Sequence, residues 1–548
     1  MAKLRHMTIL SLCIFFFTGA ISLRTEAREP LFKGLGDFGR KVTTGSAEAQ
    51  RYFNQGLAFM YAFNHDEAIR SFNAAERIDP GCAMAFWGVA IANGPHINNP
   101  VVTEAKAKAA WTALNRAKTL APRSSPVERS LINALAFRYA DPQPADRAPL
   151  DQAYANAMRQ VWNDFPTDAD VGALFAESLA DLRPWDLWTP DGMPRPGTNE
   201  LIRTLRSVLD LNPLHPLGNH LFIHAVEASP NPGLADRSAE VLRDLQPGLG
   251  HLVHMPSHVD VRQGRWQQAI TANRKAIAAD QQYTMQSGKQ GFYRLYMAHN
   301  HHMLAYAAMM TGQSELALKT IHEMVDRIPL DFFRQNPFAD GFMAMPLEVK
   351  MRFGRWDEIL AEPEFPPFAP ISSALRHYAR AVAYAAKEDV ASAMTEQAEF
   401  LESRGRVPQD AVFGNNPAAA ILDVAENFMR GELLYRAGKI AEGLSLLGKA
   451  VSLEDNLRYD EPPGWIIPTR HAYGAALLET GNFQQAEAVF REDLRRLPEN
   501  GWGLYGLMRS LRALKRPDEA DSVEKKFDST WKLADIQIKS PCLCLPGV

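Results

Sequence analysis

The chain has 548 residues, of which 46% are apolar and 22% are charged, and this ordinary globular composition excludes disordered, collagen-like and coiled-coil proteins. The 59 Lys and Arg residues against 63 Asp and Glu residues give a formal net charge of -4 without a basic cluster, so we do not expect nucleic acid as a partner. Four cysteines without a CxxC or CxxCH motif exclude a disulfide framework, a zinc ribbon and c-type haem attachment.

Residues 1–27 have the pattern of a signal peptide. A basic start is followed by the apolar residues 8–17, and Ala20 and Ala27 each end a plausible cleavage site. An uncleaved anchor helix is the alternative, although the apolar run is at the short limit of about 17 residues for a bilayer span. No later segment of the sequence approaches a membrane helix. We therefore expect an exported protein, periplasmic or secreted, with no membrane span after signal removal.

A spacing of roughly 34 residues recurs through the rest of the chain. Two clear copies combine small residues, large apolar residues and a proline at matching positions: Gly56, Phe59, Ala68, Phe72, Ala75 and Pro80 in one, and Gly474, Leu477, Gly481, Ala486, Phe490 and Pro498 in the other. Small residues allow two antiparallel helices to approach closely, large side chains fill the space between them, and the proline ends the second helix. The pattern predicts helix pairs over residues 48–535, after a lead segment at 28–47 and before a flexible tail at 536–548.

These two copies resemble the tetratricopeptide-repeat superfamily, and the resemblance extends over roughly residues 48–530. The motifs RPWDLW at 183–188, HMPSH at 254–258 and EPP at 461–463 also resemble a family of exported bacterial repeat proteins with a histidine-rich groove. The superfamily resemblance implies an all-α, right-handed solenoid of antiparallel helix pairs. It also implies that the first helices of the pairs line a concave groove, which usually binds an extended peptide.

Several copies depart from the repeat pattern because of long inserts, at 95–103, 183–198, 280–297 and 330–339. Such loops are the parts of the chain able to cap the groove and turn an open peptide track into a closed pocket. Trp185 and Trp188 lie in one insert, where large aromatic side chains often line a ligand pocket. The alternative is that they fasten the insert to the solenoid.

Histidine is concentrated in one part of the chain, since nine of the 15 histidines lie between His215 and His302. When the three repeats there are aligned on Ala235, Ala269 and Ala317, the resemblance places repeat positions 2, 5 and 9 on the groove face. Steps of three and four residues keep these side chains on one face of a helix. Seven of the nine positions hold histidine, and we call these residues the histidine stripe: His220, His224, His251, His254, His258, His299 and His302.

We expect the histidine stripe and Glu227 to be metal ligands. Axes of packed neighbouring helices lie about 8–10 Å apart, so imidazoles from adjacent helices can reach one ion at about 2.0–2.1 Å. Imidazole suits copper, iron and zinc, and the lack of nearby thiolates argues against a closed structural zinc site. Because the histidines outnumber the ligands of one ion, Glu227 is a candidate ligand, bridging carboxylate or hydrogen-bonding partner of an imidazole. The alternative is a histidine-lined groove that binds an anion or responds to pH.

Three further residues are candidate catalytic groups. Tyr306 occupies a groove position next to His302 and is placed to donate a hydrogen bond or a proton to a bound ligand, with simple packing as the alternative. Glu461 and His471 are candidate acid and base residues. A structural ion pair is the alternative for them, and the sequence does not decide whether their segment faces the histidine stripe across the groove.

No GxGxxG, Walker, GxSxG or HExxH motif occurs in a fitting context, so an enzyme here is expected to work through bound metal. The preferred hypothesis is an exported tetratricopeptide-like protein that binds one or more transition-metal ions, and a small-molecule ligand in the groove, as an oxidoreductase or a hydrolase. The main alternative is a non-catalytic scaffold that binds a peptide or protein partner in the groove. Metal storage or delivery without turnover is a third possibility.

Overall fold

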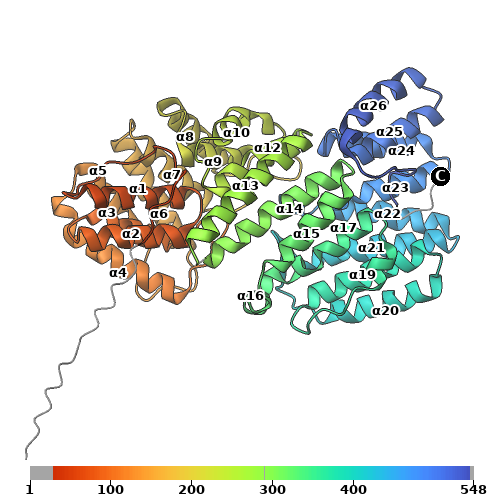
Figure 1. Ribbon diagram of the computed structural model, residues 1–548, viewed down its shortest axis with the longest axis horizontal. Coiled ribbons are helices and arrows are strands. Elements are labelled where there is room, and N and C mark those ends of the chain that lie inside the picture. Colours follow the sequence, from red (N-terminus) through yellow and green to blue (C-terminus); the bar gives the residue numbers. More distant parts are fainter. Residues whose placement is uncertain (1–28, 289, 544–548) are drawn as a thin grey trace, which may run out of the picture.

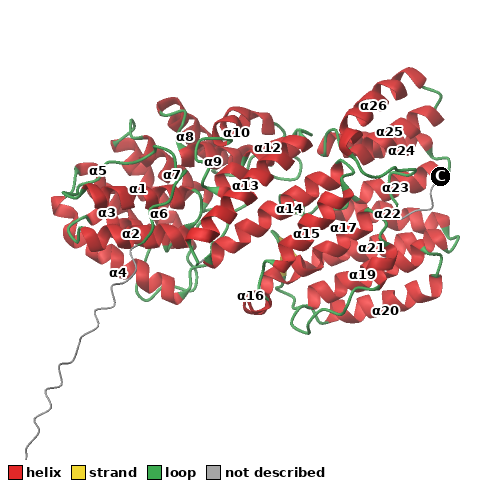
Figure 2. Cartoon of the chain, in the orientation of Figure 1, coloured by secondary structure: helices red, strands yellow, loops and turns green. Residues whose placement is uncertain are grey.

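The computed structural model describes residues 29–288 and 290–543. The signal peptide expected at 1–27 lies outside the described residues. Helices dominate the described chain, and its strands, β1 (Val412–Phe413) and β2 (Asn416–Pro417), form one short antiparallel hairpin (Figure 2).

Two lobes follow one another along the chain (Figure 1). The first lobe contains α1 (Ala47–Tyr61), α2 (His65–Ile78), α3 (Ala83–Ala92), α4 (Glu104–Leu120), η1 (Ala121–Arg123), α5 (Pro126–Leu135), α6 (Ala148–Asp164), α7 (Ala169–Ala180), α8 (Thr198–Leu211), α9 (Pro216–Val226), η2 (Pro232–Ala235), α10 (Asp236–Leu242), α11 (Gly250–His254), α12 (Pro256–Arg262) and α13 (Trp266–Gln286). The second lobe contains η3 (Gly291–Tyr293), α14 (Arg294–Met310), α15 (Ser314–Asp326), α16 (Leu330–Gln335), η4 (Pro337–Ala344), α17 (Met345–Arg352), α18 (Trp356–Leu360), α19 (Pro370–Ala386), α20 (Val390–Gly405), α21 (Ala418–Arg436), α22 (Ile440–Asp455), α23 (Thr469–Glu479), α24 (Phe483–Arg496), α25 (Gly501–Ala513), α26 (Pro517–Thr530) and η5 (Trp531–Leu533).

Each helix packs mainly on the next one in the chain, as α1 does on α2, α3 on α4, α19 on α20 and α21 on α22. Short turns join most of these pairs, so the two helices of a pair run antiparallel. Two large hydrophobic cores lie mainly one in each lobe, although side chains of α12 and α13 belong to the second core and those of η3 and the start of α14 to the first. Two smaller clusters surround Phe490 and Phe333. The predicted fold class, an all-α solenoid of antiparallel helix pairs with loop inserts, is confirmed.

The repeat motif produces the same packing unit near both ends of the chain. The ring of Phe72 lies between the backbones of Gly56 and Gly88, where an added Cβ atom would come within 2.5 Å of the ring. Phe490 is held in the same way between two glycines of the last repeats, at 474 and 506. A buried phenylalanine thus fills the space that two glycines leave between neighbouring helices, which is the arrangement expected from the tetratricopeptide resemblance.

Substituting Gly56 by alanine is expected to lower the free energy of unfolding by about 1–2 kcal/mol, because the new methyl group meets the Phe72 ring in a packed core. Chemical denaturation followed by circular dichroism measures the change. Gly405→Ala is the matched control, since a Cβ atom there has no neighbour within 4 Å. Equal stability of the two variants would show that the Phe72 ring moves aside without cost.

The segments at the two ends of the described chain pack onto the helices. In the lead segment, the Phe32 amide donates to Gln55 Oε1 at 2.9 Å, and Arg40 pairs with Asp168 at 2.8 Å. At the other end, the described residues of the segment expected to be a flexible tail pack onto the second lobe as far as residue 543. Cys542 is buried in the second core with the apolar side chains around it, and Arg352 donates to the Pro541 carbonyl at 2.9 Å.

None of the helices in the described part of the chain combines the length and apolar composition that crossing a membrane requires.

Candidate metal centre

Four helices at the junction of the two lobes carry the histidine stripe. Helix α9 provides His220 and His224 and ends just before Glu227. Helices α11 and α12 follow each other through Met255, and Pro256 begins α12, so His254 and His258 stay one helical turn apart on the same face. Helix α14 provides the last members of the stripe, at 299 and 302. The sequence prediction that these side chains share one surface agrees with their ring contacts.

Ligand atoms of the described residues form three groups of three, in each of which the atoms lie within 4.8 Å of one another: two groups of histidines and a third that consists of His224, Glu227 and His258. We call the two groups of histidines the first triad, which consists of His220, His224 and His251, and the second triad, which consists of His254, His258 and His299. In the first triad the Nε2 atoms of His220 and His251 are 3.1 Å apart, and in the second the Nε2 atoms of His254 and His258 are 2.7 Å apart. Two imidazole ligands of one tetrahedral ion hold their nitrogens roughly 3.3 Å apart, so both spacings are close to that of ligands to a shared ion.

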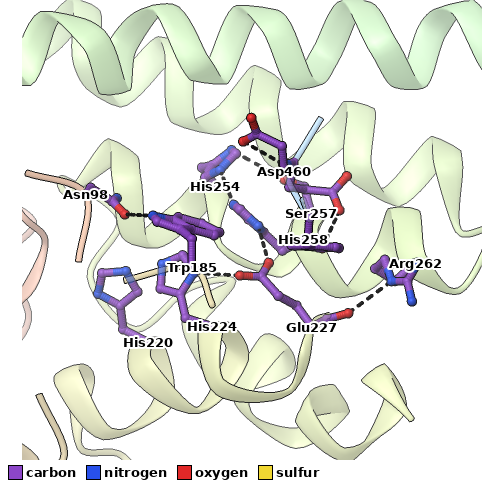
Figure 3. Close-up of polar contacts among 12 residues, drawn as sticks. Asn98, Trp185, His220, His224, Glu227, His254, Ser257, His258, Arg262 and Asp460 are labelled. Carbon is purple, nitrogen blue, oxygen red and sulfur yellow. Dashed lines mark hydrogen bonds and ion pairs between the residues drawn. The ribbon is translucent and has the colours of Figure 1, made fainter. Parts of the chain in front are cut away.

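Glu227 joins the two triads. Its carboxylate Oε1 lies 2.8 Å from His224 Nδ1, and its Oε2 lies 2.5 Å from His258 Nδ1 (Figure 3). Because the carboxylate is held at the Nδ1 atoms, it orients both rings and turns their Nε2 atoms toward the triads. His224 Nε2 has no partner among the described residues, and His258 Nε2 faces His254 Nε2. Such carboxylate–histidine pairs typically fix the tautomer and orientation of metal ligands.

Two other rings are oriented by neutral acceptors. His220 Nδ1 lies 2.8 Å from the Tyr61 carbonyl oxygen, and His254 Nδ1 lies 2.6 Å from Asn273 Oδ1. A carbonyl oxygen only accepts, so His220 carries its proton on Nδ1 and presents an unprotonated Nε2 when neutral. Sequence reasoning missed both partners: the Tyr61 contact uses the main chain, and Asn273 lies on the second helix of its repeat, outside the groove positions.

Three buried ring nitrogens of the histidine stripe receive no hydrogen bond from any described residue: His224 Nε2, His251 Nδ1 and His302 Nε2. A buried polar atom without a partner costs about 1–3 kcal/mol. These three nitrogens are therefore available as ligands or hydrogen-bonding groups.

Burial keeps most of the stripe neutral. It lowers the pKa of His220, His251, His254 and His299 well below the usual value, and it lowers the pKa of His302 to about 4. His258 is the exception, because the adjacent Glu227 carboxylate outweighs burial and raises the pKa of this imidazole. Neutral imidazole is the form that binds metal ions, so the stripe is ready for metal without prior deprotonation.

A cavity of about 230 Å³ lies against this cluster. His224, His251, His258, His299 and His302 line one side of it. All four predicted inserts contribute to its wall, through Asn98, Trp185, Phe292 and Phe333 among others. Trp185 Nε1 donates to Asn98 Oδ1 at 3.0 Å, which fastens two of the inserts together above His224 (Figure 3). The inserts thus convert the groove at this point into a pocket.

The candidate catalytic residues end up in different places. Glu461 lines the cavity, and burial raises the pKa of its carboxyl to about 7. Tyr306 is buried next to Trp266, outside the cavity wall, and its hydroxyl has no partner among the described residues.

His471 is buried away from the cavity wall. Its Nε2 lies 3.1 Å from Asp493 Oδ2, and Arg352 donates to its Nδ1 at 2.7 Å. Both ring nitrogens are engaged, so the structure does not bring His471 to the histidine stripe. The reason is that its helix, α23, faces α17 and α24 within the second lobe.

Two further histidines, His65 and His96, lie close to the first triad. The rings of His65 and His96 stack with centroids 4.1 Å apart, and Phe63 separates them from His220, whose ring centroid is 4.3 Å from that of Phe63. Aromatic packing against the triad is their observed role. This role could not be predicted from the sequence, because His65 begins α2 and His96 lies in the insert at 95–103, both outside the groove positions of the repeats.

No family model matches the chain, and no curated protein is similar enough in sequence to match it. Solved structures with some likeness include the human IFIT1 dimer with m7Gppp-AAAA, at 13% identity over 90% of this chain and 92% of that chain with a TM-score of 0.34. The Cut9–Hcn1 hetero-tetramer of the APC/C has 13% identity over 87% and 76% of the two chains, with a TM-score of 0.33. The TPR domain of P58(IPK) has 11% identity over 86% and 99%, with a TM-score of 0.21. At these scores the fold assignment depends on the helix pairs of the chain itself, and no partner or activity follows from the likeness.

Proposed function

We propose that the protein binds transition-metal ions, copper, iron or zinc, through the first and second triads, and uses them to act on a small molecule in the adjoining cavity. The observation that carries the proposal is the convergence of largely buried imidazoles, whose ligand atoms lie within 4.8 Å of one another in each triad, together with the unpartnered Nε2 of His224 and Nδ1 of His251. Three histidines per ion would leave a coordination position for substrate, as in catalytic metal sites. Storage of metal would not require a lined cavity next to the ligands.

Each part of the centre has a distinct task. The triads supply the ligands, and Glu227 together with Asn273 and the Tyr61 carbonyl fixes the direction of the rings. Bound metal would supply Lewis-acid or redox chemistry, which is the difference between a hydrolase and an oxidoreductase. Glu461 is the proposed acid or base, because its carboxylate lines the cavity opposite no cationic side chain.

The helical-repeat fold is one that also serves as a scaffold for peptides and proteins, so a peptide in the groove is the alternative function. Two observations favour the metal centre. Inserts contribute to the wall of the cavity beside the stripe, and the described residues of this wall include five imidazoles but no lysine or arginine, the cations that usually hold a peptide carboxylate.

The metal content of the untagged mature protein, purified without chelators or nickel resin, is the direct test. Mass spectrometry with an inductively coupled plasma is expected to find at least one transition-metal ion per chain. Its identity distinguishes redox from hydrolytic chemistry. Absence of metal after reconstitution with zinc, copper, iron and manganese would reject the proposal and leave the scaffold function.

Metal removal is expected to lower the melting temperature by several degrees, and reloading is expected to restore it. An ion at a free concentration of 100 times its dissociation constant stabilises the folded chain by about 2.7 kcal/mol. Differential scanning calorimetry of chelator-treated and reloaded protein measures the shift. Calcium serves as the control ion, since imidazoles do not suit it. A melting temperature that does not respond to the reloaded ion would mean that the triads do not bind it in the folded state.

A further inference from the structure

The cavity beside the triads has two chemically different halves. The half next to the stripe is polar and includes Asp460 and Glu461. Apolar side chains form the rest of the wall, among them Phe333, Phe338 and Phe342 from the segment that runs from α16 to η4. A ligand that fills the whole cavity therefore needs a polar end and an apolar end.

The charges in the wall restrict the polar end. Among the described residues that line the cavity, none is lysine or arginine, whereas two are acidic. The hydroxyl of Tyr459 donates to Glu461 Oε2 at 2.5 Å, and no described residue donates to Oε1 of the same carboxyl. His258 lines the cavity and has a raised pKa, but Glu227 already balances its charge. An anionic head group would therefore meet these carboxyls without a further protein cation to balance it. An uncharged hydrogen-bond donor fits this end.

The size and shape of the wall restrict the apolar end. A cavity of about 150 Å³ accepts one benzene molecule, so a volume of about 230 Å³ suits one ring with one or two short substituents. Six aromatic residues line the cavity: Trp185, Phe292, Tyr296, Phe333, Phe338 and Phe342. Offset and edge-to-face contacts with such side chains favour a planar ring over an alkyl chain of equal area.

We propose that the cavity binds an uncharged monocyclic phenol, with its ring among the phenylalanines and its hydroxyl directed to Glu461 and the second triad. This inference names the substrate class of the site and rests on the proposed function, because it places the hydroxyl beside the metal ligands. The residues that hold the ring, however, belong to a different part of the chain from those that hold the metal.

Binding of 4-ethylphenol to the protein as purified is the test, by isothermal titration calorimetry. Two ligands of similar shape are compared with it: 4-ethyltoluene, which replaces the hydroxyl by a methyl group, and 4-ethylbenzoate, which is an anion. On chelator-treated protein, where no bound cation attracts the anion, we expect both to bind at least fivefold more weakly, because one cannot donate to Glu461 and the other is repelled by the acidic wall. Tighter binding of either comparison ligand, or no binding of 4-ethylphenol, would overturn the phenol assignment.

The variant Phe338→Ala tests whether the ring lies at the apolar end. Phe338 is 39% exposed although it lines the cavity, so its loss leaves the cores of the fold intact. We expect the affinity for 4-ethylphenol to fall about threefold to tenfold. Phe137→Ala is the matched control, since Phe137 is 55% exposed and does not line the cavity. Equal losses in the two variants, or none, would contradict the proposed position.

Repeating the titration on chelator-treated protein separates this inference from the proposed function. Aromatic binding with no metal in the protein as purified or after reconstitution would reject the metal centre while keeping the phenol pocket. Metal binding with no affinity for 4-ethylphenol would reject the phenol pocket and keep the metal centre.

Discussion

Replacing His254 and His258 together by alanine will remove metal from the second triad and reduce the metal content of the protein by at least half. Two of its three imidazoles are then absent, and the remaining His299 cannot hold an ion alone. Their ring nitrogens are 2.7 Å apart, so both substitutions affect the same position. The measurement is metal analysis after dialysis against metal-free buffer, with circular dichroism to show that the helices persist.

A control outside the stripe and a second variant within the same triad complete this test. His322→Ala removes a histidine outside the stripe, whose Nδ1 lies 2.7 Å from the Leu318 carbonyl oxygen within its own helix, and is expected to retain all metal. Because His254 and His258 are buried, the double variant could unfold. His299→Ala alters a partly exposed member of the same triad and is expected to weaken binding without that risk. Unchanged metal content in both folded variants would exclude the second triad as a metal site.

The sequence could predict the stripe because the relevant geometry is local. Residues three and four apart share a helical face, so the register of a repeat alone places His251, His254 and His258 on one surface. The packing unit of Phe72 with its two glycines follows from the same register. Both predictions depend on spacing within one helix pair, which the sequence displays directly.

The path of the solenoid cannot be predicted from the spacing within one repeat, as Glu461 and His471 show. The two are ten positions apart in the sequence, yet Glu461 lines the histidine cavity while His471 is enclosed between α17 and α24. Which of the two faces the histidine stripe across the groove depends on the summed rotation of many helix pairs and on the loop that precedes α23. Small changes in each packing angle accumulate, so groove position alone could not predict the outcome.

The groups that orient the histidine rings also could not be predicted from the sequence. A main-chain carbonyl such as that of Tyr61 has no residue signature, and any residue type could supply it. The inserts were recognisable as interruptions of the repeat, but their contribution to one cavity required the fold, since Asn98 and Trp185 are brought together only there. The apolar half of the cavity likewise comes from ordinary phenylalanines whose positions match no repeat slot.

The second large effect is expected far from the metal centre, at Glu348 on α17. This side chain is buried in the second core, and burial raises the pKa of its carboxyl to about 8, while the main chain of Ile466 offsets only part of that cost. In the unfolded chain the carboxyl has its ordinary pKa of about 4.5. Between these two values the folded state binds the proton more tightly than the unfolded state, so the contribution of Glu348 to stability falls as the pH rises through this window.

Glu348→Gln is therefore expected to flatten the pH dependence of stability, because glutamine stays neutral. Each pH unit inside the window is worth at most about 1.4 kcal/mol, so the variant should gain about 2–3 kcal/mol on the parent protein between pH 5.5 and 7.5. Denaturant unfolding at several pH values measures this gain. Other buried carboxyls with raised pKa values, such as Asp280 and Glu432, titrate in the same range, and taking the difference between variant and parent removes their contribution. Glu399→Gln, at an exposed position, should give a difference that does not change with pH. A Glu348→Gln curve parallel to that of the parent would mean that the buried carboxyl is already ionised at pH 5.5, which requires a compensating charge or water beside it in the second core.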